Sequence, residues 1–377
     1  MDHSSFDRRT FLKTIGSVAV TAGLAGRLSG QGQADTDVSL LTKARPKIQF
    51  GLDNFAVRAM NWKAAQLLDY AAAQKLDTLF ISDLDAFESL EEKHLHEIKA
   101  KAAGLKIDLY VGTWSICPTS TRFKKNWGTA EEHLTTGIRV AKMVGSPVLR
   151  VVLGSAEDRK TEGGIRARIA DTVKVLKTCE GKARDSGVKI AVENHAGDMH
   201  SWELAELVEA AGREFVGVNL DSGNAAWTLE DPHDVLERLG RYTICSSLRD
   251  NMIWETADGA AVAWTAAGEG LIDWKKWISR WSELCPAVPI QIETISGFSR
   301  NFPYKKEEFW TSYDKRPDAL AKFEALAKRG RPIPAFKAEG ADKKRAEQEY
   351  QKGEVERSFA YLRSAVVSAG GANGNGK

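Results

Sequence analysis

The chain has 377 residues, a formal net charge of +2 and 43% hydrophobic residues, enough for one large domain or two small ones with a sizeable core. Charged residues are mixed along the chain without a long basic run, so nothing favours nucleic acid as a partner. The cysteines are far apart and form no CxxC pair, which argues against a disulfide framework or a zinc knuckle. They are Cys117, Cys179, Cys245 and Cys285.

Residues 1–35 are predicted to be a targeting segment rather than part of the fold. Asp7-Arg8-Arg9-Thr10-Phe11-Leu12-Lys13 resembles a twin-arginine export motif, and a weakly apolar stretch follows at residues 15–25. That stretch is too short and too polar for a membrane span, so we expect no stable membrane insertion. The expected location is periplasmic or secreted, after export in the folded state. A disordered basic N-terminus is the alternative.

Short apolar strands alternate with amphipathic helices from about residue 47 onward. The predicted strands cover residues 48–53, 79–81, 107–111, 148–153, 188–192, 216–220, 243–248 and 288–292. The predicted helices between them cover residues 62–73, 94–103, 129–144, 165–183, 202–211, 232–239 and 274–284. Eight such repeats favour a closed (β/α)8 TIM barrel, here expected within residues 45–330, over an open doubly wound sheet.

Long connections are predicted at residues 117–128, 251–270 and 298–317, all at the carboxyl ends of strands, where barrel enzymes build their sites. A final barrel helix is expected at residues 318–328.

Residues 331–377 form a predicted C-terminal extension, in which the highly charged stretch 342–363 is expected to be an exposed helix and 370–377 a flexible tail. This helix is a candidate contact with a second subunit in a homo-oligomer. Its candidate docking residues are Phe359, Tyr361 and Leu362.

Acidic residues stand at three of the last four strand ends: Glu193, Asp221 and Glu293. Three carboxylates at one barrel mouth would repel one another strongly without a cation, and hard divalent ions prefer carboxylate oxygens. The alternative for each residue is a carboxylate that caps the following helix.

Four motifs give the chain from about residue 47 to 296 a resemblance to the xylose isomerase-like TIM barrels, the sugar phosphate isomerase/epimerase group that includes AP endonuclease family 2. They are Glu193-Asn194-His195, Leu220-Asp221-Ser222-Gly223-Asn224, Gly268-Glu269-Gly270-Leu271-Ile272-Asp273-Trp274 and Ile292-Glu293-Thr294. The resemblance implies that Glu193, Asp221 and Glu293 bind one divalent metal.

The chain departs from that family at the seventh strand, where Ser247 stands in place of the expected ligating histidine. Serine is a poor ligand, so a water molecule, His195 or His200 is an alternative fourth ligand. Without the histidine we expect Mn²⁺ or Mg²⁺, with Ca²⁺ and Zn²⁺ as alternatives.

Several polar residues near these carboxylates are candidates for substrate contact. His195 points to the same side as Glu193 and is a candidate general base or hydrogen-bond donor, unless it caps the next helix. Asn224 stands where related epimerases present a substrate-binding residue. Arg249 either pairs with Asp250 or touches substrate. Arg150 is expected to point into the barrel and to need a carboxylate partner.

Aromatic residues cluster in the loops at the same mouth and are candidates for stacking on a sugar ring. They are Trp114, Trp227, Trp254 and Phe298, and packing within the loops is the alternative.

Together these features predict a divalent-metal-dependent isomerase or epimerase that acts on a ketose or sugar derivative through an enediolate, with Glu193 and Glu293 moving the proton. Three alternatives stay open. The same enolate allows β-elimination from a 3-keto-glycoside by a lyase. A non-catalytic sugar-binding barrel is favoured by Ser247. An apurinic endonuclease-like phosphodiesterase needs a histidine-rich zinc cluster, and the chain has only seven histidines.

Overall fold

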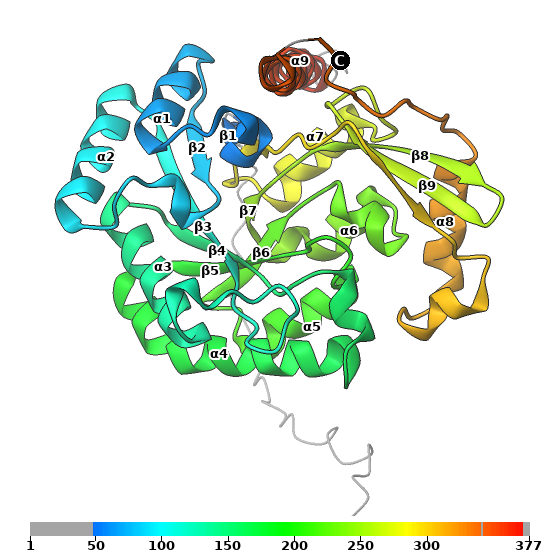
Figure 1. Cartoon of the computed structure of the whole chain (residues 1–377), viewed down its shortest axis with the longest axis horizontal. Coiled ribbons are helices and arrows are strands. Elements are labelled where there is room, and N and C mark those ends of the chain that lie inside the picture. Colours follow the sequence, from blue (N-terminus) through cyan, green and yellow to red (C-terminus); the bar gives the residue numbers. More distant parts are fainter. Residues whose placement is uncertain (1–47, 341, 372–377) are drawn as a thin grey trace, which may run out of the picture. The chain divides into compact units, whose positions relative to one another are not determined.

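Eight parallel strands form the central sheet in the computed structural model, which describes residues 48–340 and 342–371. The strands run in the order β10-β1-β2-β3-β4-β5-β6-β7 (Figure 1). Their bounds are β1 Phe50–Asp53, β2 Thr78–Ile81, β3 Asp108–Ser115, β4 Val148–Val152, β5 Lys189–Glu193, β6 Val216–Leu220, β7 Thr243–Ser246 and β10 Ile290–Ile292. A parallel bridge between Leu248 and Ile292 joins the two ends of the sheet, so the predicted (β/α)8 barrel is confirmed.

Seven helices follow the first seven strands and surround the barrel (Figure 1). They are α1 Ala64–Ala73, α2 Glu92–Leu105, α3 Ala130–Val144, α4 Gly164–Ser186, α5 Ser201–Ala211, α6 Pro232–Leu239 and α7 Trp274–Leu284. Local sequence sets their ends, as α3 illustrates. Thr129 and Glu132 form a reciprocal capping box at its start, and Gly145 ends it in the left-handed conformation, with φ of 85°.

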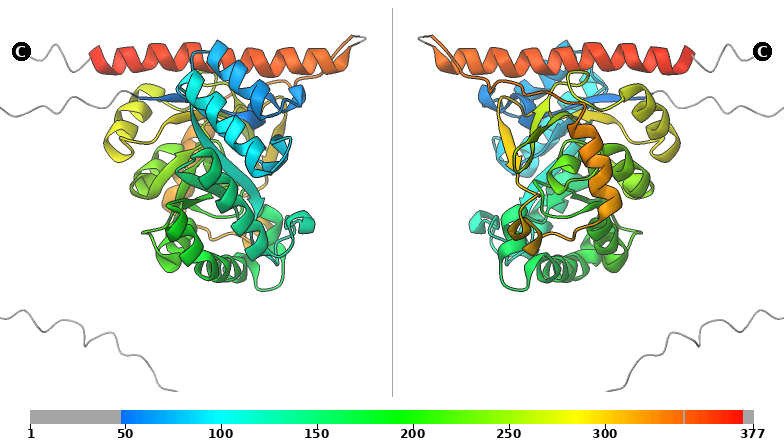
Figure 2. Two further views of the ribbon diagram at one scale, coloured as in Figure 1. Left: turned by 90° about the vertical axis from the view of Figure 1, so that its left-hand side faces the viewer. Right: turned by 90° about the vertical axis from the view of Figure 1, so that its right-hand side faces the viewer.

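The eighth helix position is taken by α9, Lys343–Gly371, which packs against α7 and against η1, Asn54–Met60 (Figure 2). Its side chains Val355, Phe359 and Leu362 are fully buried in the main core, while Tyr361 remains 38% exposed. The predicted helix is present, and two of its three candidate docking residues, Phe359 and Leu362, dock on the chain's own barrel, whereas Tyr361 lies outside this core.

The prediction that residues 318–328 form the last barrel helix is also wrong. Helix α8, Pro317–Ala327, packs instead against a second, three-stranded antiparallel sheet with the order β11-β9-β8. Its strands are β8 Asp250–Thr256, β9 Gly259–Thr265 and β11 Ser299–Phe302, within segments that were predicted as loops. The apolar face of α8 explains this placement, because Phe323 and Leu326 share a hydrophobic cluster with Ile253, Val262 and Tyr304.

The predicted export segment, residues 1–35, and residues 372–377 of the predicted tail lie outside the described residues. The four cysteines are buried free thiols. Among the described residues, no helix combines the length and apolar character needed to cross a membrane.

Candidate active site at the barrel mouth

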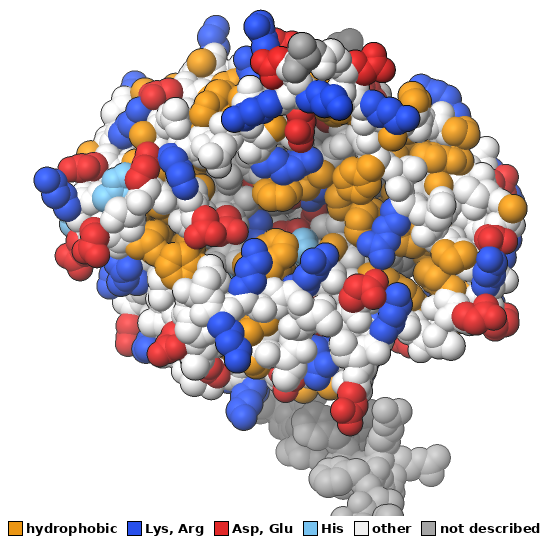
Figure 3. Space-filling view, in the orientation of Figure 1, with side chains coloured by type: hydrophobic (Ala, Val, Ile, Leu, Met, Phe, Trp, Pro, Cys, Tyr) orange, Lys and Arg blue, Asp and Glu red, His pale blue; other side chains and the backbone are white. Residues whose placement is uncertain are grey.

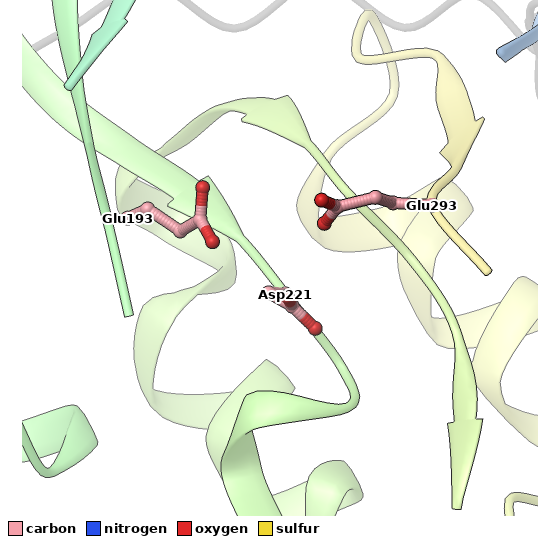
Figure 4. A group of neighbouring side chains, drawn as sticks. All are labelled: Glu193, Asp221 and Glu293. Atoms are coloured by element: carbon pink, nitrogen blue, oxygen red, sulfur yellow. The ribbon is translucent and has the colours of Figure 1, made fainter. Parts of the chain in front are cut away.

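The three acidic residues expected to converge do meet at the carboxyl ends of the strands (Figure 4). Glu193 is the last residue of β5, Asp221 directly follows β6, and Glu293 directly follows β10. One oxygen of each lies within 4.8 Å of the others, and all three are buried. Within the described part of the chain, this is the only group of three or more acidic, histidine or cysteine side chains placed to share an ion.

Asp221 holds the loop after β6 as well as facing the site. Its Oδ1 accepts hydrogen bonds from the backbone N–H groups of Gly223 and Asn224, at 2.7 and 3.1 Å, just before and at the start of η5, Asn224–Thr228. Its Oδ2 faces the cluster, where the Asn224 side-chain amide donates to it at 2.6 Å. That amide also lies 3.4 Å from Oε1 of Glu193, so Asn224 bridges two of the carboxylates.

Two buried arginines neutralise part of this acidic charge. Nη2 of Arg249 donates to Oδ2 of Asp221 and to Oε2 of Glu293. Nε of Arg150 lies 3.1 Å from Oε2 of Glu193, which is the carboxylate partner that its barrel-facing position required. Arg249 does not pair with Asp250, because that carboxylate instead accepts bonds from the N–H groups of Gly268 and Ile272 and from other donors in its own loop.

Ser247 belongs to a hydrogen-bond chain that reaches a fourth carboxylate, Asp53, at the end of β1. The Ser247 hydroxyl donates to Oδ2 of Asp53 at 3.0 Å. It accepts from the amide of Asn219 at 3.1 Å, and the same amide donates to Oε2 of Glu193 at 3.1 Å. Sequence reasoning missed Asp53 and Asn219, although Asp53 ends a predicted strand just as the three recognised carboxylates do.

Burial dominates the acid–base behaviour of the cluster. Loss of water raises the pKa of Asp53, Glu193 and Glu293, and raises the pKa of Asp221 to about 6, against the opposing effect of the arginines. Burial lowers the pKa of His195 to about 4, so its ring is neutral at pH 7. Because Nδ1 of His195 lies 2.6 Å from the carbonyl oxygen of Gly154, the hydrogen is on Nδ1 and Nε2 is free to accept a proton or a hydrogen bond.

A cavity of about 360 Å³ opens above the carboxylates, and Figure 3 shows this hollow with basic and hydrophobic side chains around it. Of the residues predicted to touch substrate, Trp114, His195, Asn224, Trp227 and Arg249 line it.

Trp254 does not line the cavity, and His200 is buried beside Trp202 instead. The hairpin register explains the outcome for Trp254. Asn251 pairs with Trp264 across the two strands, and Trp254, three residues further along β8, therefore lies on the opposite face. Trp264 was missed by sequence reasoning, yet it lines the cavity and stacks on Trp227 with 4.4 Å between ring centroids.

The chain belongs to the family described as xylose isomerase-like TIM barrel, whose family model matches residues 62–294. A curated relative, 3-oxo-isoapionate decarboxylase from Pectobacterium atrosepticum, is 22% identical over 186 residues, which are 49% of this chain and 60% of the relative. The chain thus spans about three fifths of the length of that relative.

Solved structures confirm the fold. A xylose isomerase domain protein from Planctomyces limnophilus has a TM-score of 0.51 at 16% identity, over 75% of this chain and 99% of that chain. D-psicose 3-epimerase from Clostridium cellulolyticum H10, solved with D-tagatose, has a TM-score of 0.52 at 14% identity, over 84% and 99%. The IOLI protein with a zinc atom has a TM-score of 0.52 at 16% identity, over 76% and 100%.

The carboxylates form a possible metal site, because their oxygens are the hard donors that Mg²⁺ and Mn²⁺ prefer. Two other features do not fit a bound ion. A nitrogen of Arg249 lies between two of the three carboxylates, and the hydroxyl of Ser247 is already bonded to Asp53 and Asn219. In this arrangement a guanidinium, not an open gap, faces Asp221 and Glu293.

Proposed function

We propose that the chain is a sugar isomerase or epimerase that moves a proton on the carbon beside a carbonyl group in a ketose or sugar derivative. The observation that carries this proposal is the pair Glu193 and Glu293, which come from β5 and β10 and reach the floor of one cavity. Two carboxylates that reach one cavity from different strands of a barrel suit removal of a proton and its return to a different face or a different atom.

In the proposed reaction one glutamate takes the proton from the substrate carbon. The C–H electron pair becomes the C=C bond of an enediolate, and the former carbonyl oxygen takes the negative charge. The guanidinium groups of Arg150 and Arg249 lie within the cluster and favour that charge in a site with little water. In epimerisation the other glutamate, which starts as the carboxylic acid, gives its proton to the opposite face of the same carbon. In isomerisation a proton is added to the neighbouring carbon, and the hydroxyl proton moves from one enediolate oxygen to the other, so that the carbonyl group changes place.

The rings at the cavity wall support a carbohydrate substrate. Trp114, Trp227 and Trp264 line the cavity, and indole faces stack well on the C–H faces of sugar rings. The neutral ring of His195 stands among them, with its edge toward Trp114 at 5.5 Å between centroids.

The sequence also predicted Mn²⁺ or Mg²⁺, which would be held by Glu193, Asp221 and Glu293. Such an ion would supply Lewis acidity for the enediolate when bound. The carboxylate geometry supports this part of the proposal, and the placement of Arg249 opposes it.

A second candidate is a reaction that uses an enolate to cleave a bond. In β-elimination from a 3-keto-glycoside, the enolate left by proton removal expels the group on its β-carbon. In loss of CO₂ from a 3-oxo sugar acid, the electron pair of the broken C–C bond forms the enolate, which then takes up a proton. The relative named as a decarboxylase favours the latter. So does the basic cavity wall, where Arg122 and Arg300 are placed to meet a carboxylate.

The test is an NMR screen of ketoses, oxidised glycosides and 3-oxo sugar acids with the purified protein in deuterated water. Epimerase or isomerase activity places deuterium on the substrate carbon, and lyase or decarboxylase activity releases a new product. Glu293→Gln should abolish the exchange, because the amide cannot accept the proton. Unchanged exchange in Glu293→Gln would remove Glu293 from the proton-transfer role, and no turnover of any sugar would favour a binding barrel.

A further inference from the structure

Arg249 is built firmly into the carboxylate cluster. Its side chain is only 2% exposed, and its guanidinium carbon lies 4.4 Å from the ring centroid of Trp264. Its backbone N–H donates to the Ser222 hydroxyl at 3.0 Å, and that hydroxyl donates to the Arg249 carbonyl at 2.6 Å. Gly223 leaves the room that the side chain needs, because a Cβ at that position would overlap it.

The buried carboxylates of the cluster repel one another unless a positive charge lies between them, and the guanidinium of Arg249 supplies such a charge. Four buried carboxylates, those of Asp53, Glu193, Asp221 and Glu293, face only two buried arginines. Arg150 pairs with Glu193. In the described part of the chain, only Arg249 forms ion pairs with both Asp221 and Glu293, and the family resemblance assigns the joining of these carboxylates to a metal ion.

Arg249 also has donors left over. Its Nε and Nη1 are buried and have no hydrogen-bond partner among residues 48–340 and 342–371, and Oδ1 of Asn224 is likewise without one there. A buried N–H that lacks a partner is costly, so such groups in a cavity floor indicate a ligand that completes them. Both residues line the cavity.

We propose that Arg249 replaces the divalent metal in this barrel: it holds Asp221 and Glu293 together and supplies the positive charge that receives the oxygen of the substrate. The first half of this inference is that Arg249 takes the place of the metal between Asp221 and Glu293, and it does not depend on the proposed function. The second half is that Arg249 receives the oxygen of the substrate, and it rests on the proposed function. Arg249 is fixed in charge at any physiological pH, and its remaining N–H groups are donors to the oxygen that becomes negative in the enediolate.

Manganese titration tests the first half without any substrate. The full chain is dialysed against EDTA and titrated with MnCl₂ by calorimetry and by electron paramagnetic resonance. We expect no Mn²⁺ bound at the cluster in the wild type, and one bound Mn²⁺ in the double variant Ser247→His with Arg249→Met, which opens the gap and adds an imidazole. Adding Asp221→Asn to the double variant should abolish this binding, and circular dichroism checks that each variant folds.

Two results of the titration would overturn the inference that Arg249 takes the place of the metal ion. In the first, the wild-type protein binds one Mn²⁺, Asp221→Asn abolishes this binding, and Arg249→Met leaves the affinity for Mn²⁺ unchanged. The other is a folded double variant that binds no Mn²⁺, because Arg249 would then not be what excludes the ion.

Turnover of a substrate found in the NMR screen tests the second half. Deuterium exchange at the substrate carbon should continue after the protein has been dialysed against EDTA. Arg249→Met should lower kcat about 100-fold or more, as loss of an oxyanion donor does. We expect added guanidinium ion to restore part of the activity of Arg249→Met. If deuterium exchange by the wild type stops in EDTA and returns with Mn²⁺, the inference is contradicted. If the titration behaves as expected but no sugar turns over, the proposed function fails while the placement of Arg249 as the cation of the cluster stands.

Discussion

Arg300 is a single residue whose contacts suggest a preference among sugars. It comes from β11, lies over the ring of Trp227 at 4.6 Å and lines the cavity together with Arg122. A guanidinium held on an aromatic face beside a cavity is well placed to bind a carboxylate.

We expect Arg300→Gln to weaken binding of an acidic sugar derivative by roughly 10- to 100-fold, the effect of losing one charge-assisted hydrogen bond, and to leave neutral ketoses nearly unaffected. Calorimetry with matched acidic and neutral sugars measures this difference. Arg316→Gln is the control, because Arg316 stacks on Trp202 and does not line the cavity. Equal losses for both kinds of sugar would show that Arg300 does not recognise an anion.

At the scale of single residues, sequence reasoning found the carboxylates because strand ends of a parallel barrel meet at one mouth, so position along the chain predicted position in space. It did not find the partner of Arg249, because the ion pairs with Asp221 and Glu293 join residues 28 and 44 positions apart. It did not choose Trp264 over Trp254, because that choice depends on the register of a hairpin that was predicted as a loop.

Helix α9 makes a prediction about stability at the scale of one element. Phe359 is 1% exposed and Tyr361 is 38% exposed on the same helix. We expect Phe359→Ala to lower the free energy of unfolding by about 3–5 kcal/mol, because it leaves a cavity in the core. Tyr361→Ala should give a clearly smaller loss. Denaturant unfolding of both variants measures the contrast, and similar small losses would mean that α9 is not part of the core.

Helix α3 contains a buried histidine, His133, that contacts strand β3 and makes the stability of the fold depend on pH. His133 is 0% exposed, and its Nε2 lies 2.5 Å from the Thr113 hydroxyl. Burial lowers the pKa of His133 to about 4, from an ordinary value of 6.5. Between these values the unfolded chain takes up the proton first, so this residue makes the fold less stable as pH falls from 6.5 toward 4.

Thermal unfolding between pH 7.5 and pH 4.5 checks this sign. As the pH is lowered, the melting temperature of the wild type should drop relative to that of His133→Gln, because the buried carboxylates with raised pKa contribute equally to both proteins and only the wild type has the histidine. Parallel curves for the two proteins would show that His133 does not contribute. A variant at His96, His96→Gln, is the control, because His96 is exposed in the fold.

At the scale of the elements, hydrophobic periodicity located seven of the barrel helices and all eight strands. It misassigned the eighth helix because the buried face of α9 mixes apolar Phe359 with polar Gln351 and Ser358, whereas α8 has the clearer apolar face, so only their tertiary partners decide which one covers the barrel. The inserted sheet supplied those partners for α8.

Export is a property of the whole molecule, and we propose that the chain leaves the cytoplasm by the twin-arginine route. Replacing Arg8 and Arg9 by lysine should keep the protein in the cytoplasmic fraction of a host that has this pathway. Arg27→Lys, outside the motif, should be exported like the wild type. Fractionation and blotting measure the distribution, and equal export of both variants would contradict the proposal.

The helix that completes the ring is the last element of the described residues, and this has a consequence for biosynthesis. The backbone N–H of Ala59 donates to the side chain of Gln351 at 2.9 Å, across 292 positions of sequence. During translation η1 and the flank of the barrel beside it therefore stay uncovered until residues 343–371 have left the ribosome. A nascent chain in this state exposes the apolar surface that Phe359 and Leu362 later cover, and we expect it to need chaperone protection until α9 has packed.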